Sequence, residues 1–280
     1  MIKKNLLILA FAAMFLNFVS AASEKDPQQK SFNKEKDLLL VQLDCKTDVD
    51  DLHTAAALYT LMQNVQFSGV QYHVVAGTYG IQEGLYVPPN ELLNLAWGDQ
   101  WTNAHADFDA AVQKVKTMVA TTLSGQGDIW IADAGQSDFT AAVVKAIADE
   151  YPELALKQRV HVVQHSTWNE EVTSPEKLQY VKDQADYQKI PDGNAVGNGT
   201  PGFRTPGYTQ WKTQITDPKL LNIWQLAVEL GLQYNAKEGR YNNEAVAAKG
   251  LDFSDLSEVC WIFGLEDIWD TAAFFKLYAD

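Results

Sequence analysis

Residues 37–63 read DLLLVQLDCKTDVDDLHTAAALYTLMQ and contain an apolar run, a cluster of acids and a second apolar segment. The first part, residues 37–43, is short and almost wholly apolar, which predicts a strand covered on both faces. Residues 51–63 then place Ala, Leu and Met at helical spacing. The segment therefore predicts a buried strand followed by a helix, with an acidic loop between them.

The same alternation continues along the chain. The sequence predicts further strands at residues 71–77, 128–132 and 159–164, and helices at residues 90–97, 108–123, 140–150, 218–231, 243–249 and 267–278. Strands that alternate with helices predict a parallel sheet with right-handed crossovers. The ligands of such a sheet are expected beyond the C-terminal ends of the strands.

Residues 190–210 interrupt this alternation. The part from 191 to 207 holds five Gly and three Pro. This composition is typical of a long structured loop or lid of the kind that often carries function. It also fits a linker between two domains, and both interpretations remain open.

The N-terminal segment has the pattern of a secretory signal. Two lysines precede a continuous apolar stretch at residues 6–16, which is shorter than a membrane span, and small residues follow it. We expect residues 1–21 to be a signal peptide, residues 22–36 a flexible lead-in and residues 37–280 a single α/β domain. The mature protein is then secreted or periplasmic, with no stable membrane insertion after cleavage.

The overall charge is strongly negative. The chain has 22 Lys and Arg against 36 Asp and Glu, which gives a formal net charge of −14. Nucleic-acid binding requires a basic stripe that replaces the counterions on phosphate, so we expect no nucleic-acid partner. The sequence also lacks the GxxxxGK[ST], HExxH and GxSxG motifs, which argues against a P-loop, a zincin site and a serine nucleophile elbow.

Four carboxylates lie within the eight residues after the first predicted strand: Asp44, Asp48, Asp50 and Asp51. Negative charge packed this densely at the end of a buried strand costs free energy unless a cation or hydrogen bonds offset it. Oxygen ligands favour Ca²⁺ or Mg²⁺ over softer metals. Capping of the following helix would explain one or two of the four acids, not all of them. The cluster predicts a metal or polyol site, with capping as the alternative.

The segment from Asp44 to His53, DCKTDVDDLH, resembles the N-terminal signature of the nucleoside hydrolases and their secreted relatives, a strand followed by Asp-x-Asp-x-x-x-Asp-Asp. Residues 133–141 (DAGQSDFTA), 165–170 (HSTWNE) and 269–273 (WDTAA) resemble later elements of this family in the same order. The resemblance implies an open, mostly parallel α/β sheet with helices on both faces. It also implies hydrolysis of the N-glycosidic bonds of nucleosides or related ribosides by a calcium-bound water.

Position by position, the resemblance implies a role for each matching residue. The implied calcium ligands are Asp44, Asp51, the main-chain carbonyl of Asp138 and the side chain of Asp270. The implied substrate-binding residues are Asp50 and Asn169 for the sugar hydroxyls and Trp168 or Trp269 for stacking. Trp269 stands where the family usually has a His near the leaving base, so protonation of that base needs another acid, for which His165 and Glu171 are the candidates. Asp44 and Asp48 are the implied catalytic carboxylates.

Lys46 departs from the family signature, because it stands where the family has a second acid that is both ligand and general base. A protonated Lys neither binds Ca²⁺ nor accepts a proton. In one interpretation Asp48 has taken over, which gives an active but altered hydrolase. In the other, the Lys46 ammonium occupies the cation position and leaves a metal-independent pseudoenzyme that binds a sugar or nucleoside. Both predict a small-molecule nucleoside or sugar as partner and leave a homo-oligomer open.

Overall fold

The computed structural model describes residues 30–194, 202–265 and 268–279. The predicted signal peptide, residues 1–21, and residues 22–29 of the predicted lead-in lie outside the described residues. Residues 31–280 form one compact unit, so the Gly- and Pro-rich segment at 190–210 does not link two domains. Within the described ranges, every helix is too short or too polar to cross a bilayer.

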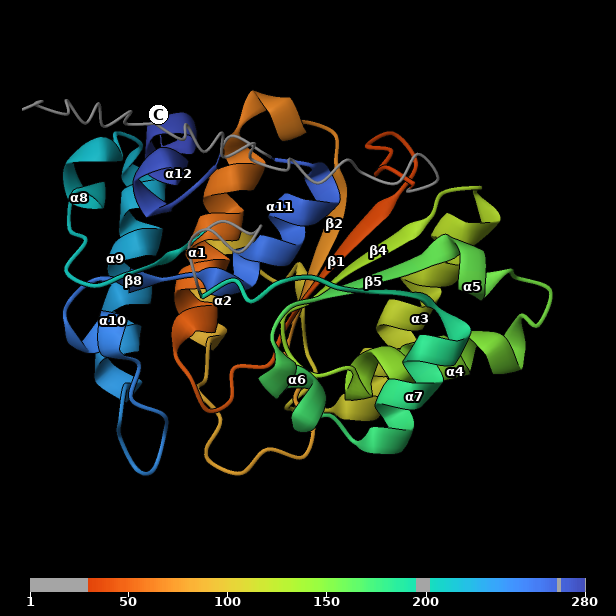
Figure 1. Cartoon of the computed structure of the whole chain (residues 1–280). Helices are drawn as coiled ribbons and strands as arrows, with labels where there is room; N and C mark the ends of the chain where they lie inside the picture. Colours follow the sequence, from red (N-terminus) through yellow and green to blue (C-terminus); the bar gives the residue numbers. More distant parts are fainter. Residues whose placement is uncertain (1–29, 195–201, 266–267, 280) are drawn as a thin grey trace, which may run out of the picture. The chain divides into compact units, whose positions relative to one another are not determined.

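A six-stranded sheet lies at the centre of this unit, and neighbouring strands in the described part pair in parallel (Figure 1). Its strands are β1 (Leu38–Leu43), β2 (Gln71–Ala76), β3 (Trp101–Asn103), β4 (Ile129–Asp133), β5 (Val160–Gln164) and β6 (Asp186–Lys189). Their order is β3-β2-β1-β4-β5-β6, so the direction of winding reverses between β1 and β4. Ligands of open α/β sheets bind beyond the carboxyl ends of the strands at such a reversal.

Both faces of the sheet are covered, because successive strand residues point to opposite sides. Leu39 and Val41 of β1 join one apolar core, and Leu38 and Leu40 join the other. The first core is shared with α1 (Asp50–Gln63), α2 (Asn90–Trp97), α9 (Pro218–Tyr234), α11 (Ser257–Phe263) and α12 (Thr271–Tyr278). The second is shared with α3 (Phe108–Ser124), α4 (Asp138–Glu150), α5 (Leu156–Arg159) and α7 (Pro175–Gln184). The predicted α/β sheet with helices on both faces is confirmed.

The remaining elements are short and lie in the connections. They are η1 (Val65–Phe67), α6 (Thr167–Glu171), α8 (Trp211–Gln214), α10 (Glu244–Ala247), η2 (Ser254–Leu256) and the antiparallel pair β7 (Arg204–Thr205) and β8 (Leu251–Asp252). Of these, α6 directly follows the carboxyl end of β5, and η2 leads into α11. These short pieces bring later segments of the chain to the end of the sheet where β1 and β5 stop.

Helix α1 is buried almost all round, because residues 51–62 all lose their contact with solvent. It packs against the sheet on one side and α9 on the other (Figure 1). Three consecutive alanines, residues 55–57, suit this close packing. Because α1 is packed on both sides, the positions of Asp50 and Asp51 in its first turn are fixed.

The compact unit begins before the predicted boundary at residue 37. The Phe32 ring packs edge to face against Trp130 and Phe263, with ring centroids 6.4 and 5.0 Å apart. The Asn33 N–H donates to the Asp37 carboxylate over 2.8 Å. Residues 31–36 therefore belong to the packed unit rather than to a flexible lead-in.

Candidate functional site

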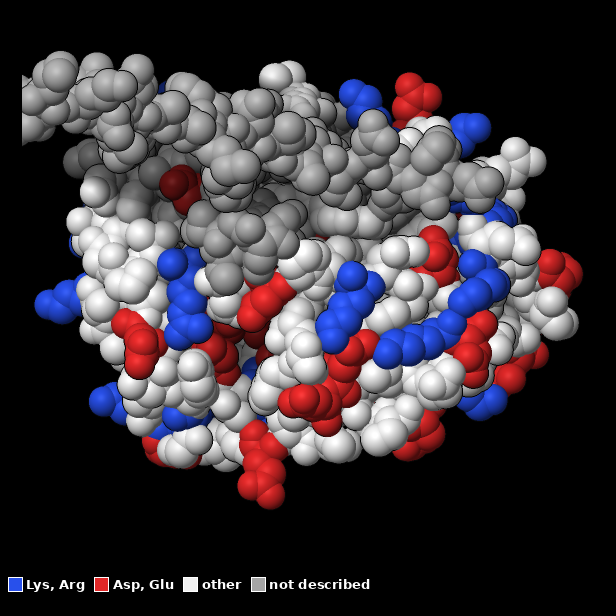
Figure 2. Space-filling model, in the orientation of Figure 1, with Lys and Arg blue, Asp and Glu red and all other residues white. Residues whose placement is uncertain are grey.

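A cavity of about 340 Å³ opens at the end of the sheet where β1 and β5 stop. Its wall is rich in acids, and six of its residues are Asp44, Asp48, Asp50, Asp51, Asp192 and Asp255. Figure 2 shows acidic side chains gathered around a hollow on this face. The cavity lies where the strand order predicts a ligand site.

The loop after β1 turns sharply and brings Asp44 and Asp51 together. Cys45 has a left-handed backbone, with φ of 53°. Its N–H donates to the Asp51 carboxylate over 2.7 Å, while the Lys46 N–H donates to Asp44 over 2.7 Å. The other Asp44 oxygen accepts from the Gln136 side chain over 2.8 Å. Burial raises the pKa of Asp44 to about 6 in spite of these donors.

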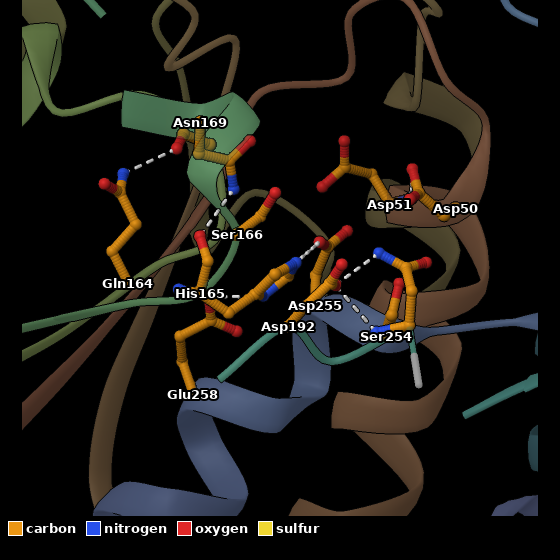
Figure 3. A network of polar contacts seen from close by, with 12 residues as sticks. Asp50, Asp51, Gln164, His165, Ser166, Asn169, Asp192, Ser254, Asp255 and Glu258 are labelled. Atoms are coloured by element: carbon orange, nitrogen blue, oxygen red, sulfur yellow. Dashed lines mark hydrogen bonds and ion pairs between the residues drawn. The ribbon is translucent and has the colours of Figure 1, made fainter. Parts of the chain in front are cut away.

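Asp50, Asp51 and Asp255 form the tightest acidic group among the described residues (Figure 3). Each offers a carboxylate oxygen, and these oxygens lie within 4.8 Å of one another. Asp51 is 3% exposed, and its Oδ1 has no hydrogen-bond partner. Burial raises the pKa of all three well above the usual range, and repulsion between the carboxylates adds to this. Three carboxylate oxygen donors this close, with a buried and unsatisfied oxygen on Asp51, could hold a metal ion.

His165 follows β5 and is paired with a buried acid on α11. The backbone N–H of His165 donates to Glu258 Oε1 over 2.9 Å, and the ring Nδ1 of His165 is 2.7 Å from the same oxygen. This second contact is an ion pair rather than an aligned hydrogen bond, since Nδ1 has no hydrogen-bond partner. Burial disfavours the charged ring, but the carboxylate of Glu258, together with those of Asp192 and Asp252, outweighs this effect, so the pKa of His165 is raised. His165 Nε2 is 3.8 Å from Asp255 Oδ1, which places the imidazole ring beside the acidic group.

The turn between β5 and α6 places the next two lining residues. Ser166 has a left-handed φ of 69°, and its hydroxyl accepts from the Trp168 N–H over 3.2 Å. This cap sets the start of α6, with Trp168 47% exposed at the cavity. Asn169 is buried, and its side-chain N–H donates to the His165 carbonyl over 3.3 Å.

Asp48 lies on the opposite side of the loop and is held by a buried network. Its carboxylate accepts from the Val49 N–H over 2.6 Å and from Asn243 over 3.1 Å. Asn243 also donates to Asp252 over 2.7 Å, and Arg204 Nε is 3.4 Å from the same Asp252 carboxylate. Burial, followed by the charge of Asp252, raises the pKa of Asp48 to about 6.

Lys46 lines the cavity but does not enter the acidic group. Its ammonium lies over the ring of Tyr79, 4.6 Å from the centroid. No carboxylate among the described residues is within ion-pair distance of it. The ammonium is therefore directed to an aromatic face rather than to the position between Asp50, Asp51 and Asp255.

Seven of the ten predicted site residues line the cavity: Asp44, Asp48, Asp50, Asp51, His165, Trp168 and Asn169. Asp138, Trp269 and Asp270 are not among its lining residues. The main-chain carbonyl of Asp138, predicted as a calcium ligand, thus belongs to a residue outside the cavity wall, and the Asp138 carboxylate accepts from the Ser174 N–H and hydroxyl over 3.1 and 2.5 Å.

The structure likewise gives Asp270 and Trp269 other surroundings. The Asp270 carboxylate caps α12 by accepting from the Ala273 N–H over 2.8 Å, and Trp269 is 71% exposed. The late aspartate that reaches the cavity is Asp255, which sequence reasoning missed together with Glu258. A single Asp in a short turn gives no pattern of its own, and only the fold brings it to α1.

Comparison of the sequence with protein-family models and with curated proteins finds no match. The function of the cavity therefore has to be argued from its chemistry.

Proposed function

We propose that the protein hydrolyses the N-glycosidic bond of nucleosides or related ribosides, with calcium bound by Asp50, Asp51 and Asp255. The observation that carries this proposal is the close group of three carboxylates, two of them buried, in which Asp51 Oδ1 has no partner. Three ionised carboxylates this close repel one another strongly unless a cation lies between them. Their oxygens are the ligands that Ca²⁺ prefers.

The size and lining of the cavity support a nucleoside-sized ligand. Its volume of about 340 Å³ is near the lower end of the range of roughly 300–1,000 Å³ for small-molecule sites. Asn169 and Asp50 line the cavity and can form hydrogen bonds to sugar hydroxyls, and the Trp168 ring, which also lines it, provides an apolar face. A polar floor with an aromatic wall is suited to a sugar that carries a planar base.

Calcium bound there would supply coordination sites for neighbouring ribose hydroxyls and lower the pKa of a bound water. The side chains around it have separate tasks. Departure of the base leaves positive charge on the sugar, which the carboxylates of Asp50 and Asp51 stabilise. Asp48 can accept a proton, because its pKa is raised toward neutrality, it lies outside the tight group, and it is more exposed at the cavity than Asp44. Asp44 is held in place by hydrogen bonds from the Lys46 N–H and the Gln136 side chain, and its charge raises the pKa of Asp51.

A binding protein without hydrolysis is the second candidate, and it rests on Lys46. A lysine at this position removes one acid from the family signature. The direction of its ammonium, toward Tyr79, keeps the Lys46 charge out of the group formed by the Asp50, Asp51 and Asp255 oxygens. This favours the metal-dependent hydrolase over the pseudoenzyme.

The proposal is tested by incubating the purified protein with Ca²⁺ and a panel of ribonucleosides, and by measuring free base and reducing sugar. We expect release that stops on chelation, returns on addition of Ca²⁺, and is lost in Asp51→Asn. Absence of free base at high protein concentration would contradict hydrolysis. Calorimetry distinguishes the second candidate, because ligand binding that is unchanged by EDTA would support a metal-independent binding protein.

A further inference from the structure

Two half-exposed aromatic rings line the cavity from separate parts of the chain. Trp168 lies in the first turn of α6 and is 47% exposed, and Tyr241, between α9 and α10, is 49% exposed. The Tyr241 N–H donates to the Thr47 carbonyl over 3.3 Å, which ties its segment to the acidic loop. Aromatic faces open to solvent at a ligand site are suited to stack on a planar ring, and they attract a cationic one most strongly.

The charge of the wall favours the same kind of ligand. Six aspartates line the cavity, and the basic residues among the lining are Lys46 and Arg204, apart from His165. Arg204 is 3.4 Å from the buried Asp252 carboxylate, and the Lys46 ammonium lies over Tyr79. The wall keeps an excess of negative charge even with a divalent cation bound. Such a field attracts a cationic ligand and repels a phosphorylated one.

A cationic base also suits the bond that has to break. When the base is a pyridinium, the C1′–N bond breaks with both electrons passing to the ring nitrogen, which becomes neutral. The oxygen of water forms the new bond to C1′, and its proton passes to a carboxylate of the cavity and then to solvent. The leaving base needs no proton, so no acid has to reach it. The acidic wall stabilises the positive charge before and during this step.

We infer that the site is selective for ribosides whose base carries a permanent positive charge, and that Trp168 and Tyr241 hold this pyridinium ring. The inference rests on the proposed function, because it names the substrate class of the same cavity. It predicts discrimination by charge rather than by hydrogen bonds to the edges of the base.

The test uses two non-cleavable probes with one skeleton, a neutral pyridine C-riboside and its N-methylpyridinium form. Calorimetry in saturating Ca²⁺ is expected to show at least about tenfold tighter binding of the pyridinium form. Trp168→Leu and Tyr241→Leu should each reduce this ratio. Phe108→Leu is the matched control, because Phe108 is 40% exposed and does not line the cavity.

Three results would overturn all or part of the inference, and they are distinguishable. Equal or tighter binding of the neutral probe, with Ca²⁺-dependent hydrolysis of uridine or inosine, would refute charge selectivity and leave the proposed function standing. Absence of binding of ribose and of both probes, with no nucleoside hydrolysed, would refute the proposed function and the inference together. A pyridinium preference that both aromatic variants leave unchanged would refute the role of the two rings.

Discussion

The buried acids make the stability of the metal-free protein depend on pH. Burial raises the pKa of Asp44 from 3.8 to about 6, so the folded state holds a proton that the unfolded state has already released. For a carboxyl with a raised folded pKa, the stabilising effect is complete below the unfolded pKa and is lost as the pH rises through the folded pKa. The contribution of Asp44 to the free energy of unfolding should therefore fall between about pH 4 and pH 6.

The size of the effect follows from linkage. A rise in pKa from 3.8 to about 6 in a side chain that is 6% exposed corresponds to about 3 kcal/mol lost above pH 6. For a chain of this size, a loss of this free energy of unfolding lowers Tm by about 6–12 °C. A bound Ca²⁺ takes the place of the missing protons, so its stabilising effect should be small near pH 4.5 and large near pH 7.5.

The assay is thermal unfolding followed by circular dichroism, in EDTA and in saturating Ca²⁺, at steps between about pH 4.5 and 7.5. Titrating groups far from the cavity contribute equally with and without Ca²⁺, so they cancel in the difference between the two Tm values. We expect this difference to grow with pH, mainly below about pH 6.5. A difference that is constant with pH, or that is largest at low pH, would refute the reasoning.

Three further predictions concern single residues. Asp255→Asn should abolish Ca²⁺ binding measured by calorimetry. Asp270→Ala should still bind Ca²⁺ and should lose only about 1 kcal/mol of stability, because Asp270 caps a helix. The opposite result, with Ca²⁺ binding lost in Asp270→Ala and kept in Asp255→Asn, would make Asp270 the ligand. Lys46→Asp should raise the affinity for Ca²⁺, because it adds a carboxylate to the cavity wall. An unchanged affinity would show that Lys46 does not occupy the position of the second acid in the family signature. Phe32→Ala should lower the free energy of unfolding by about 2 kcal/mol in urea titrations; an unchanged midpoint would mean that residues 31–36 do not stabilise the unit.

The central strands could be predicted from sequence because each is a compact apolar run. β1, β2, β4 and β5 lie within one or two residues of their predicted limits. β6 was missed because its sequence, DYQK, has no apolar run, and as an edge strand it buries little. β3 has only three residues, too few for a period to be recognised. Pairing with a neighbour, rather than local pattern, makes these two segments strands.

The site residues, like the strands, fall into those that the local sequence predicts and those that only the fold brings to the site. Residues next to the predicted strand ends, such as Asp44 after β1 and His165 after β5, line the cavity because the carboxyl ends of parallel strands meet. Asp255 could not be predicted, since it is distant in sequence and reaches Asp50 and Asp51 only through the packing of α11 and η2. Asp270 was expected as a ligand because residues 269–273 resemble a late element of the family, and an aspartate at a helix start has the same local sequence whether it caps the helix or binds a metal.

The central claim is that Asp50, Asp51 and Asp255 hold a cation at the floor of the cavity. Diffraction from crystals grown with Ca²⁺, or with Mn²⁺ as an anomalous substitute, tests it most directly. The account predicts a single strong peak among the three carboxylates, with Asp51 Oδ1 as a ligand about 2.3–2.6 Å from Ca²⁺. A cavity that binds no ion at saturating concentration, or a peak at Asp138 or Asp270 instead, would contradict it.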